Sequence, residues 1–202
     1  MPKKTRKISD KWRMKDWYTL YGPSYFGGSE LGLAPTADPQ GLIGRVVEKT
    51  LYEITGDFSQ QHIKLYFQVT DLKGDKAETI FKGHKYSEDY LRSLVRRGST
   101  RIDGIFDVST KDGYKLRVSV VAFSISRVKA AQTSAIRAVM KKILVEKAGT
   151  LDFDQFIQEV ILGKIASDIY NEAKKTLPIR HIGIRKSKLI ATPKPLLKKE
   201  AS

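Results

Sequence analysis

IDGIFDVSTKDGYKLRVSV, residues 102–120, is the stretch that decides the fold. Its apolar side chains share one parity before the central turn and one after it: Ile102, Phe106 and Val108, then Tyr114, Leu116, Val118 and Val120. The turn, Lys111-Asp112-Gly113, supplies a glycine for the positive φ that tight hairpins need. The opposite parity after the turn carries Lys115, Arg117 and Ser119. The stretch therefore predicts an antiparallel hairpin with one buried face and one wet, basic face.

Upstream of the hairpin the pattern is also that of β-structure. Within 61–71, Ile63, Leu65, Phe67 and Val69 alternate with polar or amphipathic residues, which indicates a half-buried strand. Weaker alternation predicts strands in 44–54 and 76–84, and Ser87 can cap a short helix. Residues 21–42 are rich in Gly and Pro and are expected to be irregular. Several short strands predict an antiparallel sheet curled into a barrel-like body.

Downstream of about residue 127 the apolar period becomes helical. The first predicted helix, 128–147, carries a single apolar stripe formed by Ile136, Val139, Met140, Ile143 and Leu144. Two further helices are expected through 153–161 and 165–175, and 179–190 returns to a strand-like pattern. The predicted class is α+β, an antiparallel barrel-like body followed by packed helices and a late strand, with basic terminal extensions. The expected division is a basic extension (1–20), a β-rich body (21–126), a helical part with a terminal strand (127–192) and a basic tail (193–202).

Composition excludes several classes of protein. Hydrophobic residues make up 41% of the 202 residues, which is enough for a core. Cysteine is absent, so neither a disulfide framework nor a thiolate metal site can form. No apolar run reaches the roughly 18 residues of a membrane span, and the N-terminus lacks the apolar region of a secretory signal. We therefore expect a cytosolic protein with no membrane partner.

The net charge of +15 is concentrated in three segments. Residues 1–17 carry a net +5, residues 127–147 another +5, and residues 178–202 carry +6, which leaves −1 for the rest of the chain. Charge that serves only solubility is dispersed and of both signs, whereas segregated positive charge indicates a polyanionic partner. The sequence therefore predicts a protein that binds RNA.

No motif predicts catalysis. A phosphate-binding glycine loop is absent, because Gly183-Ile184-Arg185-Lys186-Ser187 lacks the first glycine at the required distance. The three histidines, His62, His84 and His181, have no metal-binding spacing and are interpreted as surface or strand residues. A nuclease metal cluster of Asp103, Asp107 and Asp112 is conceivable, but these positions suit a polar strand face and a turn. We expect no enzyme, no cofactor and no metal.

The candidate RNA-binding residues come from the three basic segments: Lys3, Lys4, Arg6, Lys7, Lys11, Trp12, Arg13 and Lys15; Arg127, Lys129, Arg137, Lys141 and Lys142; and Arg180, Arg185, Lys186 and Lys188. Trp12 and its neighbour Trp17 can stack on unpaired bases or pack on the body, and the sequence leaves both open. In the helix, Arg137 and Lys141 lie one turn apart, so their repulsion would be relieved by a phosphate. The alternative for that helix is an ordinary solvated face.

Five stretches, in order along residues 10–190, resemble one family, the small-subunit ribosomal protein of archaea and eukaryotes called S-one-e or S-three-A-e. They are Lys15-Asp16-Trp17-Tyr18; Gly41-Leu42-Ile43-Gly44-Arg45; Thr110-Lys111-Asp112-Gly113-Tyr114-Lys115-Leu116-Arg117; the helix from Gln132-Thr133-Ser134 to Lys141-Lys142; and the strand from Pro178-Ile179 to Lys186. The short ends resemble archaeal members.

The resemblance implies a structural constituent of the small ribosomal subunit, cytoplasmic and ribosome-bound. It implies rRNA as the main partner, on the platform near the messenger exit, with neighbouring platform proteins and messenger RNA as further partners. The alternatives are a free single-strand RNA-binding module acting in translation initiation, which needs an exposed aromatic platform, and an RNA-modifying enzyme, which needs a convergent acid or metal site.

Overall fold

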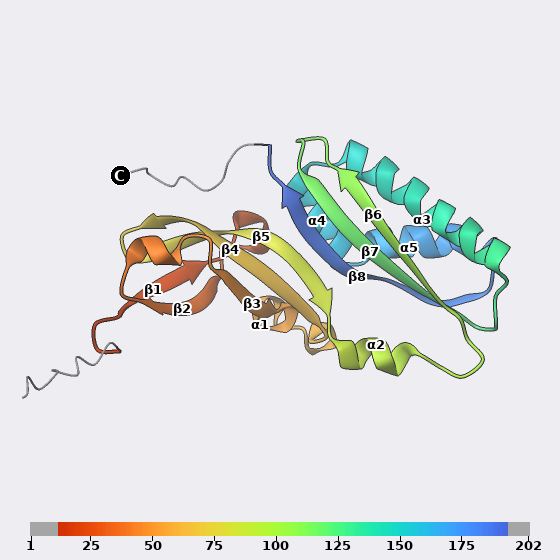
Figure 1. The fold of residues 1–202 in the computed structure, drawn as a ribbon, viewed down its shortest axis with the longest axis horizontal. Helices are drawn as coiled ribbons and strands as arrows, with labels where there is room; N and C mark the ends of the chain where they lie inside the picture. Colours follow the sequence, from red (N-terminus) through yellow and green to blue (C-terminus); the bar gives the residue numbers. More distant parts are fainter. Residues whose placement is uncertain (1–11, 194–202) are drawn as a thin grey trace, which may run out of the picture. The chain divides into compact units, whose positions relative to one another are not determined.

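The computed structural model describes residues 12–193 (Figure 1). Within this range its eight strands are β1 Asp16–Tyr21, β2 Glu30–Thr36, β3 Val46–Thr50, β4 Ile63–Lys73, β5 Lys76–Tyr86, β6 Arg101–Ser109, β7 Lys115–Ser124 and β8 Ile179–Ala191. Its five α-helices are α1 Leu51–Thr55, α2 Glu88–Leu94, α3 Ala130–Thr150, α4 Phe153–Ile161 and α5 Lys164–Ala173. Short 3-10 turns, η1 Ser24–Phe26, η2 Pro39–Leu42 and η3 Phe58–Gln60, complete the described elements. The predicted α+β class is confirmed.

The described residues form two compact units. One consists of residues 12–45 and 68–80, and the other consists of residues 46–67 and 81–193. Strands β4 and β5 contribute residues to both units. The four-part division made from the sequence stays a prediction about the organisation of the chain.

The smaller unit contains two strands that the sequence interpretation missed. β1 pairs with β2 antiparallel, for example Trp17 with Pro35, and pairs with the start of β5 in parallel, for example Leu20 with Ala77. Residues 16–20 were expected in an extension and 21–42 in irregular structure. Gly32 and Pro35, which normally interrupt strands, lie inside β2. Proline is tolerated in an edge strand, and β2 ends the strand path.

The larger unit contains the predicted hairpin. β6 pairs with β7 antiparallel, with Phe106 opposite Val118 and Val108 opposite Leu116, so the residues of the predicted apolar parity share one face. In the turn, Gly113 adopts a φ of 82° and its N–H donates to the carbonyl of Thr110 at 2.9 Å. The predicted late strand is β8, which pairs with β7 on one side and with the second half of β5 on the other.

The strand order is β2-β1-β5-β8-β7-β6, with β4 paired to β5 and to β3. The pairings β1–β2, β5–β8, β6–β7 and β7–β8 are antiparallel, and β1–β5 is parallel. Within residues 12–193 the path ends at β2 and β6, so the sheet does not close into a barrel.

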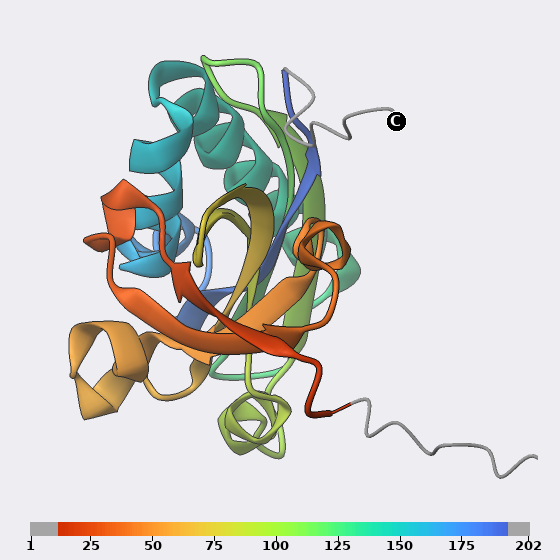
Figure 2. The same ribbon diagram turned by 90° about the vertical axis from the view of Figure 1, so that its left-hand side faces the viewer.

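Helices α3, α4 and α5 lie together on one side of strands β6, β7 and β8 (Figures 1 and 2). The predicted stripe of α3 is confirmed, because Ile136, Met140 and Leu144 are buried while Val139 and Ile143 are half-buried. At Gly104 of β6 a Cβ would lie 2.7 Å from the ring of Phe106 and 3.4 Å from the sulfur of Met140 in α3, so the ring of Phe106 occupies the space that a side chain would take. The even-numbered residues of β6 and β7 therefore form the face that the helices cover.

β5 and β8 approach each other closely at Gly83, which pairs with Lys188. A Cβ on Gly83 would lie 2.3 Å from the carbonyl oxygen of Ser187, a distance that no side chain tolerates. The φ of Gly83 is not in the positive region, so glycine is required here for space alone.

The same junction holds a buried histidine. The Nε2–H of His84 donates to the carbonyl of Ile184 at 2.9 Å, and its Nδ1 therefore accepts from the hydroxyl of Ser187 at 2.6 Å. The backbone N–H of His84 donates to the same hydroxyl at 3.2 Å. Complete burial lowers the pKa of His84 to about 4, so the ring is neutral and its polar atoms are satisfied within the fold.

The Gly83 contact can be tested with a matched pair of glycine substitutions. Gly83→Ala should lower the free energy of unfolding by about 3 kcal/mol, because the backbones of β5 and β8 must separate. Gly149→Ala should raise it by about 0.5–1 kcal/mol, since Gly149 lies in helix α3 with no atom near its missing Cβ. Urea denaturation measures both values. Equal stability of the Gly83→Ala variant and the wild type would contradict the close approach.

Candidate nucleic-acid interface

Four basic side chains lie on the face of the β7–β8 pair that the helices leave uncovered. Arg117 pairs with Lys188 and Ser119 with Lys186, while the alternating residues Leu116, Val118, Ser187 and Leu189 are buried on the opposite side. Lys115 shares the parity of Arg117 and is exposed. We call this set, Lys115, Arg117, Lys186 and Lys188, the basic sheet face.

The charges of the basic sheet face are only partly neutralised. The guanidinium of Arg117 donates to both carboxylate oxygens of Asp107, at 2.7 and 2.8 Å, which lowers the pKa of that carboxyl. Within residues 12–193 neither Lys186 nor Lys188 has an ion-pair partner. Like charges on paired strands destabilise a sheet, and a bound anion removes that cost. The arrangement therefore favours a phosphate ligand.

Helix α2 covers the other end of this face. Val121 and Phe123 of β7 are buried against Leu91 of α2, with Tyr86 and Leu94 packed around them. Along β7, the odd-numbered residues next to α2, Val121 and Phe123, are thus apolar and buried. Those at the other end, Lys115 and Arg117, are basic and exposed. Within the larger unit, the part that bears Arg117 stays open.

The four predicted residues of β8 divide into two pairs. Lys186 and Lys188 are exposed and belong to the basic sheet face. Arg180 is half-buried, with its guanidinium donating to the carbonyl of Leu94 and lying 6.0 Å from the ring centre of Phe123. Arg185 is also half-buried and lies 3.9 Å from Glu88. The two arginines therefore support the fold, whereas the lysines are available to a partner.

The predicted basic residues of helix α3 and of the segment before it are exposed: Arg127, Lys129, Arg137, Lys141 and Lys142. Arg137 also has a structural contact, because its Nε donates to the carbonyl of Asp103 in β6 at 2.9 Å. Since α3 covers the even-numbered face of β6 and β7, its cations and the basic sheet face lie on opposite sides of the sheet. The structure therefore brings together only part of the predicted set.

The N-terminal candidates are described only in part. Lys3, Lys4, Arg6, Lys7 and Lys11 lie outside the described residues. Trp12 is 59% exposed and Trp17 is 54% exposed, and their rings meet edge to face at 6.3 Å. The Nζ of Lys15 lies 4.2 Å from the ring centre of Trp12. Neither indole is part of the core, so the role of Trp12 in stacking on bases stays a prediction.

The three aspartates that could suggest a nuclease have separate structural partners. Asp103 pairs with Arg101, Asp107 pairs with Arg117, and Asp112 accepts from the N–H of Phe153 at 3.0 Å at the start of α4. Among the described residues no three His, Asp or Glu side chains gather as metal ligands. In the same part of the chain, no helix has the length and apolarity to cross a bilayer.

Several archaeal proteins similar to this chain are named "Small ribosomal subunit protein eS1". The chain is 50% identical to the one from Desulfurococcus amylolyticus over 188 residues, 93% of this chain and 88% of the relative. It is 48% identical to the one from Archaeoglobus fulgidus over 193 residues (95% and 92%) and 43% identical to one from Saccharolobus islandicus over 202 residues (100% and 97%).

The family predicted from the five sequence stretches is confirmed by a direct match. The model of the Ribosomal S3Ae family matches residues 3–193, which include the basic sheet face and helix α3. The chain therefore belongs to the Ribosomal S3Ae family.

Proposed function

We propose that this chain is a structural constituent of the small ribosomal subunit and that it binds rRNA through the basic sheet face. Its relatives are named as proteins of that subunit, and three basic segments carry all of its excess positive charge. The observation that carries the proposal is the pair Lys186 and Lys188, which lie exposed on the same face as Arg117 and have no carboxylate partner among residues 12–193.

The geometry suits phosphates rather than base edges. Lys186 and Lys188 are two positions apart on one strand, so their stems leave the sheet about 7 Å from each other. Lysine offers a mobile point charge, which positions a protein on a nucleic-acid backbone without reading sequence. The rigid sheet fixes where these charges stand, and the folded RNA supplies the complementary surface.

The finer assignment follows from the family resemblance. We place the protein in the cytoplasm, on the ribosomal platform near the messenger exit, among neighbouring platform proteins and within reach of messenger RNA. We assign it no reaction, because the family consists of structural ribosomal proteins.

The alternative is a free single-strand RNA-binding module. The exposed pair of Trp12 and Trp17 favours it, since indole rings stack on unpaired bases. The basic sheet face does not favour it, because none of its four members is aromatic.

Location gives the first test of the ribosomal role. In native lysate the protein should sediment with small subunits at low salt and leave them as salt rises, because high salt reduces the entropy gained by releasing counterions. Quantitative detection across a sucrose gradient measures the distribution. Recovery mainly in free fractions at moderate salt would contradict the proposal.

Charge removal tests the basic sheet face. The double variant Lys186→Gln/Lys188→Gln should bind small-subunit rRNA more weakly, and the slope of log affinity against log salt should shrink by about 1.5 units. Its control is Lys49→Gln/Lys64→Gln, which removes the same charge from lysines already paired with Glu53 and Glu48. The control should leave the slope nearly unchanged, and equal slopes in all three proteins would exclude this face.

The same assay separates the two sides of the sheet. Lys141→Gln/Lys142→Gln spares the structural contact of Arg137 and should reduce the slope by a similar amount if α3 also contacts phosphate. The losses from the two double variants should then add, since the faces are separate. An unchanged slope in the helix variant would mean that the basic face of α3 is solvated and does not contact phosphate.

A further inference from the structure

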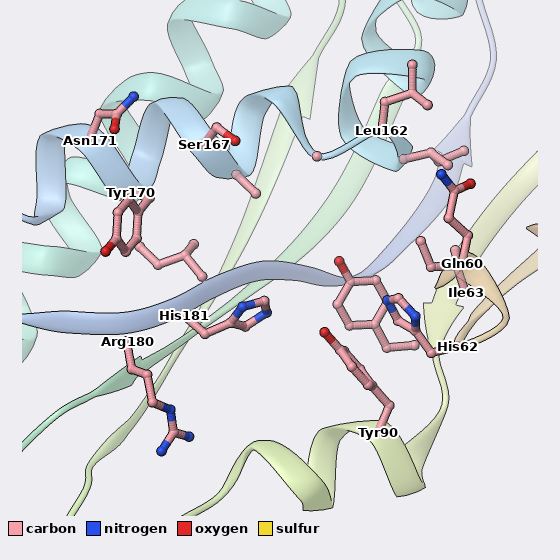
Figure 3. Close-up of a pocket in the computed structure, with 15 residues that line it drawn as sticks. Gln60, His62, Ile63, Tyr90, Leu162, Ser167, Tyr170, Asn171, Arg180 and His181 are labelled. Carbon is pink, nitrogen blue, oxygen red and sulfur yellow. The ribbon is translucent and has the colours of Figure 1, made fainter. Parts of the chain in front are cut away.

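The larger unit contains a cavity of about 510 Å³ that the RNA-binding prediction did not use. It lies between helix α5, the start of β8, helix α2 and the turn that precedes β4 (Figure 3). The side chains that line it come from segments far apart in the sequence, including Gln60, His62, Tyr90, Ser167, Asn171 and His181. No sequence pattern connects them.

One wall of the cavity is aromatic. His62 stacks on Tyr90, with ring centres 3.9 Å apart and an angle of 28° between the planes. Tyr86 meets both rings edge on, at 5.2 Å from His62 and 5.6 Å from Tyr90. Figure 3 shows His181 pointing from β8 toward this cluster, with its ring centre 6.4 Å from that of Tyr90. A flat π-system could extend the stack.

Burial favours the uncharged form of all four rings. Burial lowers the pKa of His62 and, together with the charge of Arg180, that of His181. Burial raises the pKa of Tyr86 to about 12 and also raises that of Tyr90. The wall therefore suits a neutral aromatic group rather than an ion.

The remainder of the lining combines aliphatic side chains, such as Ile63, Leu162 and Ile182, with groups that can form hydrogen bonds. The Nε2 atom of His181 is buried and has no hydrogen-bond partner among residues 12–193. Such an orphaned atom at the wall of a cavity is satisfied when a ligand supplies the partner. The amides of Gln60 and Asn171 and the hydroxyl of Ser167 add donors and acceptors of both kinds.

The lining holds little charge. Among the described residues that line the cavity, Arg180 is present and neither Asp nor Glu occurs. The guanidinium of Arg180 donates to the carbonyl of Leu94. A ligand with an uncharged ring matches this lining.

We infer that this cavity receives the base of an unpaired nucleotide, which stacks on the His62–Tyr90 pair and hydrogen-bonds with His181. The inference rests on the proposed function because it takes the ligand to be RNA. It adds a site that holds one splayed-out base, distinct from the phosphate contacts of the basic sheet face. Bases that leave the helical stack are commonly held in this way, between aromatic rings and polar side chains.

Two pentaribonucleotides test the inference with the full-length protein, one with a central adenosine and one abasic at that position. The wild type should bind the complete oligonucleotide about tenfold more tightly, as expected for one stacked base. In Tyr90→Leu the two affinities should become nearly equal. The matched control is Tyr52→Leu, because Tyr52 is a half-exposed tyrosine outside the cavity and should keep the difference.

A second substitution keeps the test independent of the fold around Tyr90. Ser167 is exposed and lines the cavity, so Ser167→Trp should reduce the tenfold difference by steric blockage, whereas Ser134→Trp on helix α3 should not. Equal binding of both oligonucleotides by the wild type overturns the inference. The next occupant of the cavity to test is then a side chain of a neighbouring protein. If the wild type binds the two oligonucleotides equally but still binds small-subunit rRNA with the expected salt dependence, only the cavity assignment fails. If the wild type binds no rRNA, the proposed function fails.

Discussion

The close contact of β5 with β8 is the constraint on which the larger unit depends. β8 enters the sheet after three helices and must fit between β5 and β7, where the absence of a side chain at Gly83 lets the backbone of Ser187 approach. The hydrogen bonds of His84 to Ser187 and Ile184 then fix the register. A slip by one residue would turn Lys186 and Lys188 into the core and expose Ser187 and Leu189. The junction therefore decides which side chains the sheet presents to a partner.

The two sides of this sheet have different roles. On one side, the stripe of α3 and the even-numbered residues of β6 and β7 build the core, which requires no ligand. On the other side, positive charges lie next to each other, and among the described residues their one carboxylate partner is Asp107. The repulsion between these charges lowers the stability of the free protein. Binding of an anion restores that stability. The exposed cations of α3 add charge on the helix side, and Arg137 combines this exposure with a contact to β6.

Much of the fold could be predicted because its apolar periods are regular. The hairpin around Gly113, the stripe of α3 and the late strand follow directly from alternation or helical spacing. β2 was missed because Gly32 and Pro35 interrupt the pattern, and an edge strand tolerates both. β1, Asp16–Tyr21, was missed because most of it was assigned to the basic extension. For the site, sequence identified the cations but not their partners. It could not show that Arg180 turns toward Leu94, nor that His62, Tyr90 and His181 meet, since these contacts exist only after the chain has folded.

The central claim is that the rigid β7–β8 pair presents its lysines to rRNA, and lysine modification tests it most directly. The full-length protein would be treated with an amine-specific acetylating reagent, once free in solution and once within small subunits, and the modified lysines would be quantified by mass spectrometry. Lys186 and Lys188 are exposed and unpaired in the described chain, so they should react readily in the free protein. In the subunit both should become protected, together with Lys115. Equal reactivity of Lys186 and Lys188 in the two states would contradict the claim.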